Sequence, residues 1–334
     1  MNPAFILAGH LHRDYLLSER DPSLMDVPGG NLLYAAAGLG IWKSGIGLLA
    51  RVGEDYPTDW LLSFEKRGWD TRGVHITPDA LDLRYFQVIL EGQAVERSDP
   101  VACFARLGLP FPKSLLGYQP PIQIDDDRKV SNPASPHPDD IPSDYLNAHV
   151  AHVCPVDYVT GTRLTSAFRQ ASVTTITLDP SAAYMNGKCA YDVRILLGGL
   201  TAFLPSEEEL RALFWGSTDD LWAMAEALGE FGCEFIVVKR GARGQMLYDS
   251  VSKKRWEIPA YPARVVDVTG AGDSFCGGFL AGYQNSYDPV RAVLFGSVSA
   301  SLAIEGSGAL HPLDCLPGLA QARLESLDGL VRQI

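Results

Sequence analysis

Apolar runs and glycine turns alternate along most of this chain. Short buried strands are predicted at residues 5–8 and 45–52, and an amphipathic helix at residues 57–67, where apolar side chains recur at helical spacing. Short apolar runs occur again at residues 150–153 and 175–178, and they predict two further strands. Strands that alternate with helices in this way predict a central, mostly parallel sheet flanked by helices.

The C-terminal half continues the pattern. Strands are predicted at residues 200–204 and 235–239, the latter followed by a glycine-rich turn and a returning strand at 245–248. A β-branched run at 265–268 predicts a strand that leads into a second glycine turn. A helix rich in small residues is expected at 292–304.

Residues 83–107 break the alternation. Apolar residues at 85–90 indicate a strand, and residues 101–107 are interpreted as its partner, with no helical pattern between them. Such strands predict a small β lid, which we place within about residues 10–28 and 83–125 of a single α/β domain spanning residues 1–334.

A proline-rich and polar segment follows, at residues 110–142, and we expect a long surface excursion there. Asp125, Asp126 and Asp127 lie in it. They fit a solvated acidic turn better than a metal cluster, because no neighbouring ligands accompany them.

Composition narrows the function. The 334 residues carry a net charge of −12 and no basic stripe, which argues against a nucleic-acid partner. No stretch is long enough to span a membrane, and residues 1–8 predict a buried strand rather than a signal peptide. The six cysteines form no C-x-x-C pair, so we expect reduced thiols and a cytoplasmic protein.

The second glycine turn is the strongest chemical signal. Gly270, Ala271 and Gly272 have little or no side chain, and Phe275 and Phe279 then follow at helical spacing. Backbone amides in such a turn can point at a ligand, and a helix N-terminus adds about half a positive charge. The segment therefore predicts a cradle for a phosphate group.

Asp273 closes the turn with a negative charge. A carboxylate beside a phosphate cradle makes sense if it accepts a proton from an attacking hydroxyl. It can equally be a first-turn acid that complements the helix dipole. The residues alone support both interpretations.

Two other glycine motifs are excluded. A dinucleotide fingerprint needs a third glycine where Phe275 stands. A Walker P-loop needs glycine directly before Lys-Ser, whereas Lys43-Ser44 follows Trp42.

Residues 267–275, Asp-Val-Thr-Gly-Ala-Gly-Asp-Ser-Phe, resemble the C-terminal signature of the PfkB carbohydrate kinases, D-T-T-G-A-G-D-x-F, with Val268 as the one departure. Residues 29–30 and 51–55 resemble the family's N-terminal signature. Residues 204–209 resemble its N-x-x-E motif, and residues 235–244 its later strand and turn beside the nucleotide. The resemblance implies a ribokinase-like α/β fold with a β lid.

The resemblance also implies ATP and Mg²⁺ as cofactors, and it implies roles for particular residues. Asp273 becomes the catalytic base, and Gly270, Ala271 and Gly272 become the anion hole. The nucleotide side would comprise Ser206, Glu209 (which would hold Mg²⁺ through water), Lys239, Gly241, Gly244 and Thr269. Asp267 and Thr269 match a monovalent cation site, such as one for K⁺, that some members have. The acceptor side would comprise Asp14, Gly29, Gly30, Asn31 and Tyr34.

Two departures bear on the substrate. Tyr34 stands where many sugar kinases of the family carry an asparagine, and Ser206 replaces the asparagine of N-x-x-E. A tyrosine could stack on a sugar or a base, or fill space, whereas Asp14 and Asn31 suit sugar hydroxyls.

Several other charged or imidazole side chains allow two interpretations. His10 and His12 fit lid or site-wall residues better than a metal pair, because no third ligand is apparent. Lys239 and Arg243 could meet ATP phosphates or be surface charges. Arg97 and Arg106 in the presumed lid could meet an anionic substrate group.

We therefore expect a kinase that phosphorylates a hydroxyl of a small molecule, most simply a sugar, with Asp273 as base. The alternatives are a nucleoside kinase, a weakly catalytic sugar or nucleotide sensor, and a purely structural α/β protein. The resemblance also makes a homodimer through the lid plausible.

Overall fold

The computed structural model describes residues 2–96, 99–120, 131–171 and 173–334. Its large sheet has ten strands in the order β14-β13-β12-β11-β10-β9-β8-β1-β4-β5. These strands are β1 (Phe5–Ala8), β4 (Ile46–Gly53), β5 (Asp70–Thr77), β8 (Val150–Val153), β9 (Thr175–Leu178), β10 (Ala202–Phe203), β11 (Phe235–Lys239), β12 (Gln245–Asp249), β13 (Arg255–Ile258) and β14 (Arg332–Gln333). The strands from β5 to β11 pair in parallel, and β12, β13 and β14 extend that edge in antiparallel fashion.

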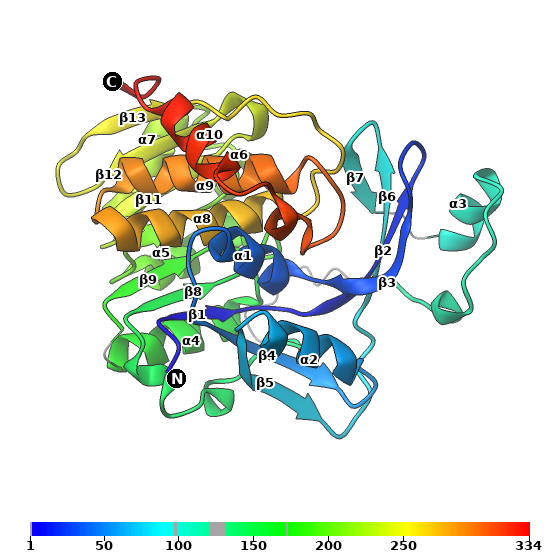
Figure 1. Cartoon of the computed structure of the whole chain (residues 1–334). Coiled ribbons are helices and arrows are strands. Elements are labelled where there is room, and N and C mark those ends of the chain that lie inside the picture. The colour runs from blue at the N-terminus through cyan, green and yellow to red at the C-terminus, as the bar shows by residue number, and fades with distance from the viewer. Residues whose placement is uncertain (1, 97–98, 121–130, 172) are drawn as a thin grey trace.

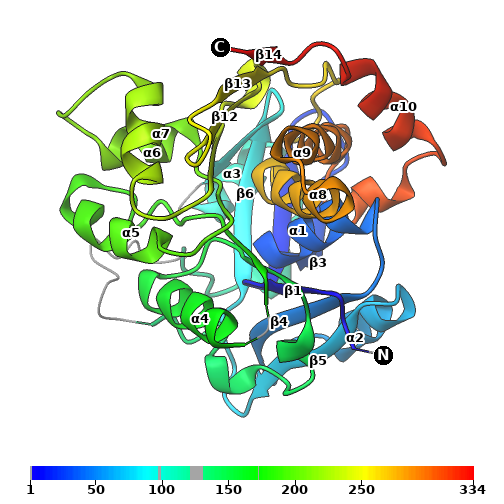
Figure 2. The same cartoon turned by 90° about the vertical axis from the view of Figure 1, so that its left-hand side faces the viewer.

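Helices cover both faces of this sheet (Figures 1 and 2). One face carries α1 (Asn31–Gly40), α2 (Thr58–Lys66), α8 (Ala271–Ser286), α9 (Pro289–Ala303) and α10 (Leu319–Leu327). The other carries α4 (Tyr158–Gln170), α5 (Ala190–Leu197), α6 (Glu207–Leu213) and α7 (Leu221–Gly229). Strand alternation explains the two cores: Phe5 and Leu7 of β1 join the first, Ile6 and Ala8 the second. The predicted α/β architecture is confirmed.

A second, four-stranded sheet forms the lid, in the order β3-β2-β6-β7. Its strands are β2 (His12–Ser18), β3 (Leu24–Gly29), β6 (Arg84–Leu90) and β7 (Gln93–Glu96), and they project beyond the main sheet in Figure 1. The lid has a small core of its own, in which Tyr15 and Phe86 are fully buried.

Two predicted strands are wrong. Residues 101–107 belong to a helix, α3 (Pro100–Arg106), because the Asp99 side chain accepts the Ala102 amide at 3.0 Å and a proline occupies the first turn. Residues 265–268 form a loop rather than a strand. The Val266 amide donates to Ile304 (2.7 Å) and the Val268 amide to Gly92 (3.1 Å), so neither joins a sheet ladder.

The proline-rich segment is described only in part, since residues 121–130 lie outside the described ranges together with Asp125–Asp127; Arg97 also lies outside them. The described elements around it are short 3-10 turns: η1 (Lys113–Leu115), η2 (Pro138–Asp140) and η3 (Tyr145–Asn147). Three more turns are η4 (Gly187–Cys189), η5 (Gly241–Arg243) and η6 (His311–Asp314).

Two expectations from composition can be compared with the structure. All six cysteines are free thiols, and five of them are buried. Among the described residues, every helix is too short or too polar to cross a membrane.

Candidate active site

The candidate site lies at the carboxyl ends of the parallel strands, where open α/β sheets place their ligands. The glycine turn enters α8 there. Gly270 is its N-cap with φ of 69°, and a Cβ at this position would lie 2.0 Å from atoms of the Tyr34 ring. Only glycine fits, for both reasons.

The turn leaves two amides available. The amide of Ala271 donates to the Val268 carbonyl at 3.1 Å, so it is engaged within the turn. Within the described ranges, the amides of Gly270 and Gly272 have no such hydrogen bond. The cradle predicted from three amides is thus offered by Gly270 and Gly272 at the N-terminus of α8.

Asp273 follows directly, in the first turn of α8. Its side chain is partly accessible but set deep in the site, so desolvation raises its pKa to about 8. The charges of Asp179 and Glu209 add to this rise, and the ammonium of Lys239 opposes it. A carboxyl group with a pKa near neutrality is suited to exchanging a proton.

A buried ion pair stands beside the cradle. Lys239, at the end of β11, places its Nζ 2.6 Å from Oδ2 of Asp179, just past the end of β9. The same Nζ lies 3.3 Å from the place of a Cβ on Gly272. Burial raises the pKa of Asp179, but the adjacent ammonium opposes that rise, and the contact keeps Lys239 charged. Lys239 therefore brings a positive charge to the cradle.

Ser206 and Glu209 form a capping box at the start of α6. Oε2 of Glu209 accepts the Ser206 amide at 2.7 Å, and Oγ of Ser206 accepts the Glu209 amide at 3.2 Å. The amide of Lys239 donates to the Pro205 carbonyl at 2.8 Å, which ties this cap to the end of β11. Glu209 is consequently held in the same acidic cluster as Asp179 and Asp273.

This cluster fits a magnesium ion held mainly by water and phosphates. No group of three or more His, Cys, Asp or Glu among the described residues forms a metal cage. Mg²⁺ usually keeps several waters and takes only one or two protein carboxylates. The cluster contains three carboxyl groups, those of Asp179, Glu209 and Asp273, and one ammonium group, that of Lys239. When the carboxyl groups are ionised, negative charge is in excess, and a divalent cation would neutralise it.

Asp267 and Thr269 also lie together. Oδ1 of Asp267 accepts the amide and the hydroxyl of Thr269 at 2.9 and 2.6 Å, while its Oδ2 is buried with no hydrogen-bond partner. One orphaned buried carboxylate oxygen fits a cation ligand.

The lid reaches this same segment. Oε1 of Gln87 in β6 lies 3.3 Å from the Thr269 hydroxyl, and the carbonyl of Gly92 at the β6–β7 turn accepts the Val268 amide at 3.1 Å. The lid therefore holds the loop that precedes the cradle.

The acceptor-side residues converge at the base of the lid. The carboxylate of Asp14 packs on Gly29, where a Cβ would lie 1.8 Å from Oδ2, and the Gly30 amide hydrogen-bonds to it. Burial raises the pKa of Asp14 to about 7. Tyr34 lies over Gly270, so it links these residues to the cradle.

Asn31 has a structural role in this arrangement. Its Oδ1 accepts the His10 amide at 2.8 Å, and its Nδ2 donates to the Pro155 carbonyl at 2.7 Å. Both ends of the side-chain amide are thus occupied by the backbone.

The histidine pair lies at the base of the lid, with His12 in β2. The rings of His10 and His12 are stacked with centroids 6.0 Å apart, and His12 contacts Tyr85 of β6 at 5.2 Å. Burial lowers the pKa of His10 to about 4 and that of His12 to about 3, so both rings are neutral at pH 7.

Of the remaining candidates, Arg243, Arg106 and Gly241 lie toward the surface, whereas Gly244 is buried. Arg243 pairs with Glu207 at 2.5 Å, and Arg106 pairs with Glu19 at 3.2 Å. Gly241 is exposed at the turn after β11, and Gly244 packs closely on the backbone of β13.

Sequence reasoning missed Asp179. Its position immediately after a predicted strand could have revealed it, because parallel strands deliver their following residues to one edge.

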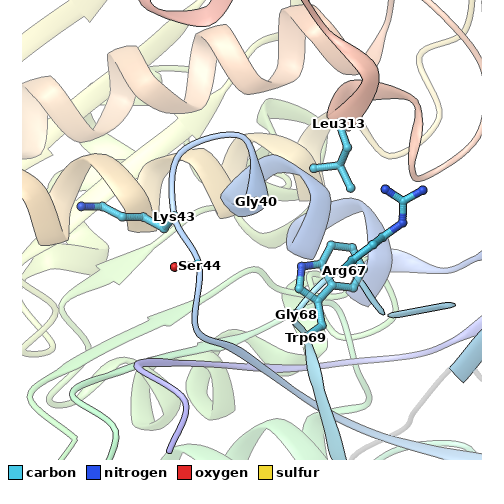
Figure 3. A pocket seen from close by; sticks show the side chains of 7 residues that line it. All are labelled: Gly40, Lys43, Ser44, Arg67, Gly68, Trp69 and Leu313. Carbon is cyan, nitrogen blue, oxygen red and sulfur yellow. The ribbon is translucent and has the colours of Figure 1, made fainter. Parts of the chain in front are cut away.

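A second pocket lies at the opposite, amino end of β4 and β5 (Figure 3). Lys43 and Arg67 both line it, but their charged ends point in different directions. They do not converge on a common ligand position.

A glycine cradle, an adjacent carboxyl and a lid on a doubly covered parallel sheet define an α/β phosphotransferase. The sequence profile of the pfkB carbohydrate kinase family matches residues 137–315, more than half of the chain. The chain belongs to this family and is a kinase.

Individual relatives agree with this assignment. A cytidine kinase of Thermococcus kodakarensis is 25% identical over 279 residues, which cover 84% of this chain and 88% of that protein. The Burkholderia thailandensis nucleoside kinase in complex with inosine superposes with a TM-score of 0.71 at 18% identity, covering 98% and 99% of the two chains. An E. coli protein described as a ribokinase II, in complex with ATP and Mg²⁺, gives a TM-score of 0.70 at 16% identity, covering 98% and 100%. The two structures share the fold.

Proposed function

We propose that this kinase transfers a phosphoryl group from ATP to a hydroxyl of a small neutral molecule, with Asp273 as general base. The observation that carries the proposal is the placement of Asp273. Its partly accessible carboxyl lies beside the amides of Gly270 and Gly272 and near the ammonium of Lys239, and its pKa is raised to about 8. A base poised near the working pH accepts a proton efficiently.

Each group then has a separate task. The acceptor hydroxyl would lie against Asp273, which takes its proton as the oxygen attacks phosphorus in line. The amides of Gly270 and Gly272, with Lys239, would stabilise charge that develops on the transferred phosphoryl oxygens. Mg²⁺, when bound with ATP near Glu209, would neutralise the phosphate charge. The lid would exclude water, which otherwise competes as acceptor.

A neutral acceptor is supported by the charges of the lid. On the described lid strands, two arginines are paired with carboxylates: Arg13 with Asp26 at 2.7 Å and Arg84 with Asp82 at 2.7 Å. An anionic sugar phosphate would need unpaired cations. Both a sugar and a nucleoside satisfy this requirement, and a relative that aligns with 84% of this chain is named a cytidine kinase.

The test is an ADP-release screen with ATP and Mg²⁺ across sugars, polyols and nucleosides. We expect turnover with at least one acceptor, and a loss of about 10²–10⁴-fold in Asp273→Asn with ATP binding retained. Near-native turnover in that variant would remove Asp273 from its role. A protein that binds ATP but releases no ADP with any acceptor would support a sensor instead.

We also propose a K⁺ site at Asp267, supported by its orphaned Oδ2. Replacing K⁺ by tetramethylammonium should lower kcat, and Asp267→Asn should abolish that difference. Equal rates in both salts would argue against the site.

A homodimer through the exposed edges of the lid sheet remains a proposal. It predicts a mass of about twice 36.3 kDa in light scattering. A monomeric mass at high protein concentration would exclude it.

A further inference from the structure

The end of the proline-rich excursion returns to the base of the lid. Residues 131–135 pack against the start of α4, where the carboxylate of Asp157 is the common acceptor. Its Oδ2 accepts the Asn132 amide at 3.2 Å and the hydroxyls of Ser135 and Thr160 at 2.7 and 2.9 Å. Ser135 is 2% exposed and Asp157 is 8% exposed. The excursion is therefore tied to the body by a buried contact.

Ser135 extends this contact to His10. Its Oγ lies 2.8 Å from Nε2 of His10, which stands in the link 9–11 between β1 of the body and β2 of the lid. This link is a hinge by its position. The backbone of His10 is also held, because its amide donates to Asn31 at 2.8 Å and its carbonyl accepts the Leu32 amide at 3.3 Å. The ring and the backbone of the hinge residue are thus both attached to the body.

The chemistry of the groups sets the direction of these hydrogen bonds. A carboxylate only accepts, so the hydroxyl of Ser135 donates its single proton to Asp157. The Ser135 oxygen is then the acceptor for His10. Because the ring of His10 is neutral at pH 7, its one proton lies on Nε2, and Nδ1 is unprotonated. Asp157, Ser135 and His10 therefore form a hinge relay that selects one tautomer and one orientation of the ring.

The ring of His10 in turn contacts the lid. It stacks on the ring of His12 with centroids 6.0 Å apart and planes inclined by 11°, and the His12 ring lies 5.2 Å from that of Tyr85 in β6. Alternation along β2 places His12 on the same face as Asp14, whereas Tyr15 belongs to the lid core on the other face. The stack therefore follows the face of the lid that carries Asp14.

We propose that Asp157 and Ser135 are positioning residues, which hold His10 and thereby set the orientation in which the lid closes over the acceptor. This role rests on the proposed kinase function and brings the end of the excursion into it. The stack has one end fixed to the body, at His10, and its other end on the lid. Releasing the fixed end lets the lid close in several orientations. Asp157 and Ser135 thus affect acceptor binding through His10 and leave ATP binding at the cradle unchanged.

The first test observes the imidazole itself, without any ligand. Heteronuclear NMR of the histidine rings should show His10 as the Nε2–H tautomer with a slowly exchanging ring proton, the signal being assigned by its loss in His10→Gln. Ser135→Ala removes the acceptor for that proton, so His10 should become a mixture of tautomers with rapid exchange. A proton on Nδ1 in the wild type, or a His10 signal that Ser135→Ala leaves unchanged, would overturn the hinge relay.

Thr160→Val is the matched control. Thr160 is also 2% exposed, and its hydroxyl donates to the same Oδ2 of Asp157. This variant removes one hydroxyl from that carboxylate, while Ser135 and His10 keep their contact. Hydrogen exchange in β2 and β6 should be faster in Ser135→Ala than in the wild type and unchanged in Thr160→Val. Equal exchange in the two variants would refute a role of the hinge relay in holding the lid.

Steady-state kinetics with cytidine and with D-ribose connect the hinge relay to the reaction. Ser135→Ala should raise the acceptor KM about three- to tenfold, as the loss of one hydrogen bond does, with kcat and the KM for ATP within about twofold of the wild type. Adding Ser135→Ala to His12→Leu should raise the acceptor KM no further, because the hinge relay acts through the His12 ring. Additive effects, or a fall in kcat at unchanged KM, would overturn the positioning role.

These measurements separate the hinge relay from the kinase activity on which it rests. A wild-type protein that turned over no acceptor would refute the kinase proposal, while the tautomer of His10 and the exchange in β2 and β6 would still decide the hinge relay. Turnover by the wild type together with Ser135→Ala kinetics equal to those of Thr160→Val would refute the positioning role and leave the kinase proposal standing.

Discussion

Gly270 shows how a single residue fixes the glycine turn before α8. It combines a left-handed backbone with a close contact to the ring of Tyr34, so a side chain is excluded on two grounds. Gly272, two residues later, faces only the flexible end of Lys239. Two glycines that look alike in the sequence therefore have different reasons to be there.

This difference gives a prediction. Gly270→Ala should lower the free energy of unfolding by about 1–3 kcal/mol through backbone strain, and further through its clash with Tyr34. Gly272→Ala should unfold within about 0.5 kcal/mol of the wild type, as ordinary substitutions do, while phosphoryl transfer falls because the added methyl intrudes on the cradle. Urea unfolding and ADP release together check this. Equal stability of the two variants would contradict the assigned contact.

The raised pKa of Asp273 has a consequence for stability. Its carboxyl holds a proton in the folded protein up to about pH 8 but releases it near pH 4 when unfolded. The folded state therefore binds more protons in between, and this contribution to stability is lost as the pH rises toward 8. Asp14 has the same sign, with its pKa raised to about 7.

Without nucleotide, Asp273→Asn should therefore be more stable than the wild type at pH 8, by about 2–4 °C in Tm, with a smaller difference at pH 5. Comparing the two proteins at each pH cancels the contribution of the buried histidines. Asp59→Asn, at an exposed site in α2, serves as control and should show no such trend. A difference that shrinks as the pH rises would refute the raised pKa.

At the scale of elements, the ends of β9 and β11 are joined by the pair Asp179–Lys239. Breaking a buried ion pair leaves one uncompensated charge and costs about 3–5 kcal/mol, whereas replacing both partners by apolar side chains can be nearly neutral. Asp179→Leu and Lys239→Met should each be strongly destabilising in urea unfolding, and the double variant should recover most of the loss.

The exposed pair Arg20–Glu91 offers a comparison. Its side chains are 73% and 81% exposed, and its disruption should cost less than about 1 kcal/mol. If the double variant at 179 and 239 lost as much free energy of unfolding as the two single variants together, the two residues would not act as a pair.

The elements also show what the sequence can and cannot predict. Periodicity located the strands and helices of the body, because each has a continuous apolar side. It failed at α3, where apolar residues suggested a strand but the Asp99–Pro100 cap determined a helix. It failed again at residues 265–268, whose β-branched side chains lie in a loop held by Ile304 and Gly92. Both partners are distant in sequence, so no local pattern reveals them.

The residues of the candidate site also fall into two groups, those that the sequence predicts and those that it does not. The turn at residues 270–273 was predictable, because its two glycines and its acid stand next to one another at the start of one helix. The roles of Asp179 and of the occupied amide of Asn31 depend on contacts between separate segments. These roles become apparent only when the strand ends are brought together.

At the scale of the whole molecule, the lid core is separate from the two cores of the body. Phe86 in the lid and Phe168 in the body are both fully buried, which makes them a matched pair. Phe168→Ala should lower the Tm of the main transition, at a cost of about 3–5 kcal/mol. Phe86→Ala should leave that transition nearly in place and raise the acceptor KM, because the lid loosens locally. Calorimetry and kinetics distinguish the two, and an equal loss of Tm in both would show that lid and body unfold together.

The contacts of Val268 and Thr269 with the lid link the position of the lid to the conformation of the segment before Asp273. If the lid swings away, the Val268 amide loses its partner at Gly92 and the Thr269 hydroxyl loses its contact with Gln87, while it keeps its hydrogen bond to Asp267. The segment leading to Asp273 is then free to relax. The glycine turn and Asp273 would thus be fully ordered only when the lid encloses the acceptor. A cell would then lose little ATP to hydrolysis by water while the acceptor is scarce.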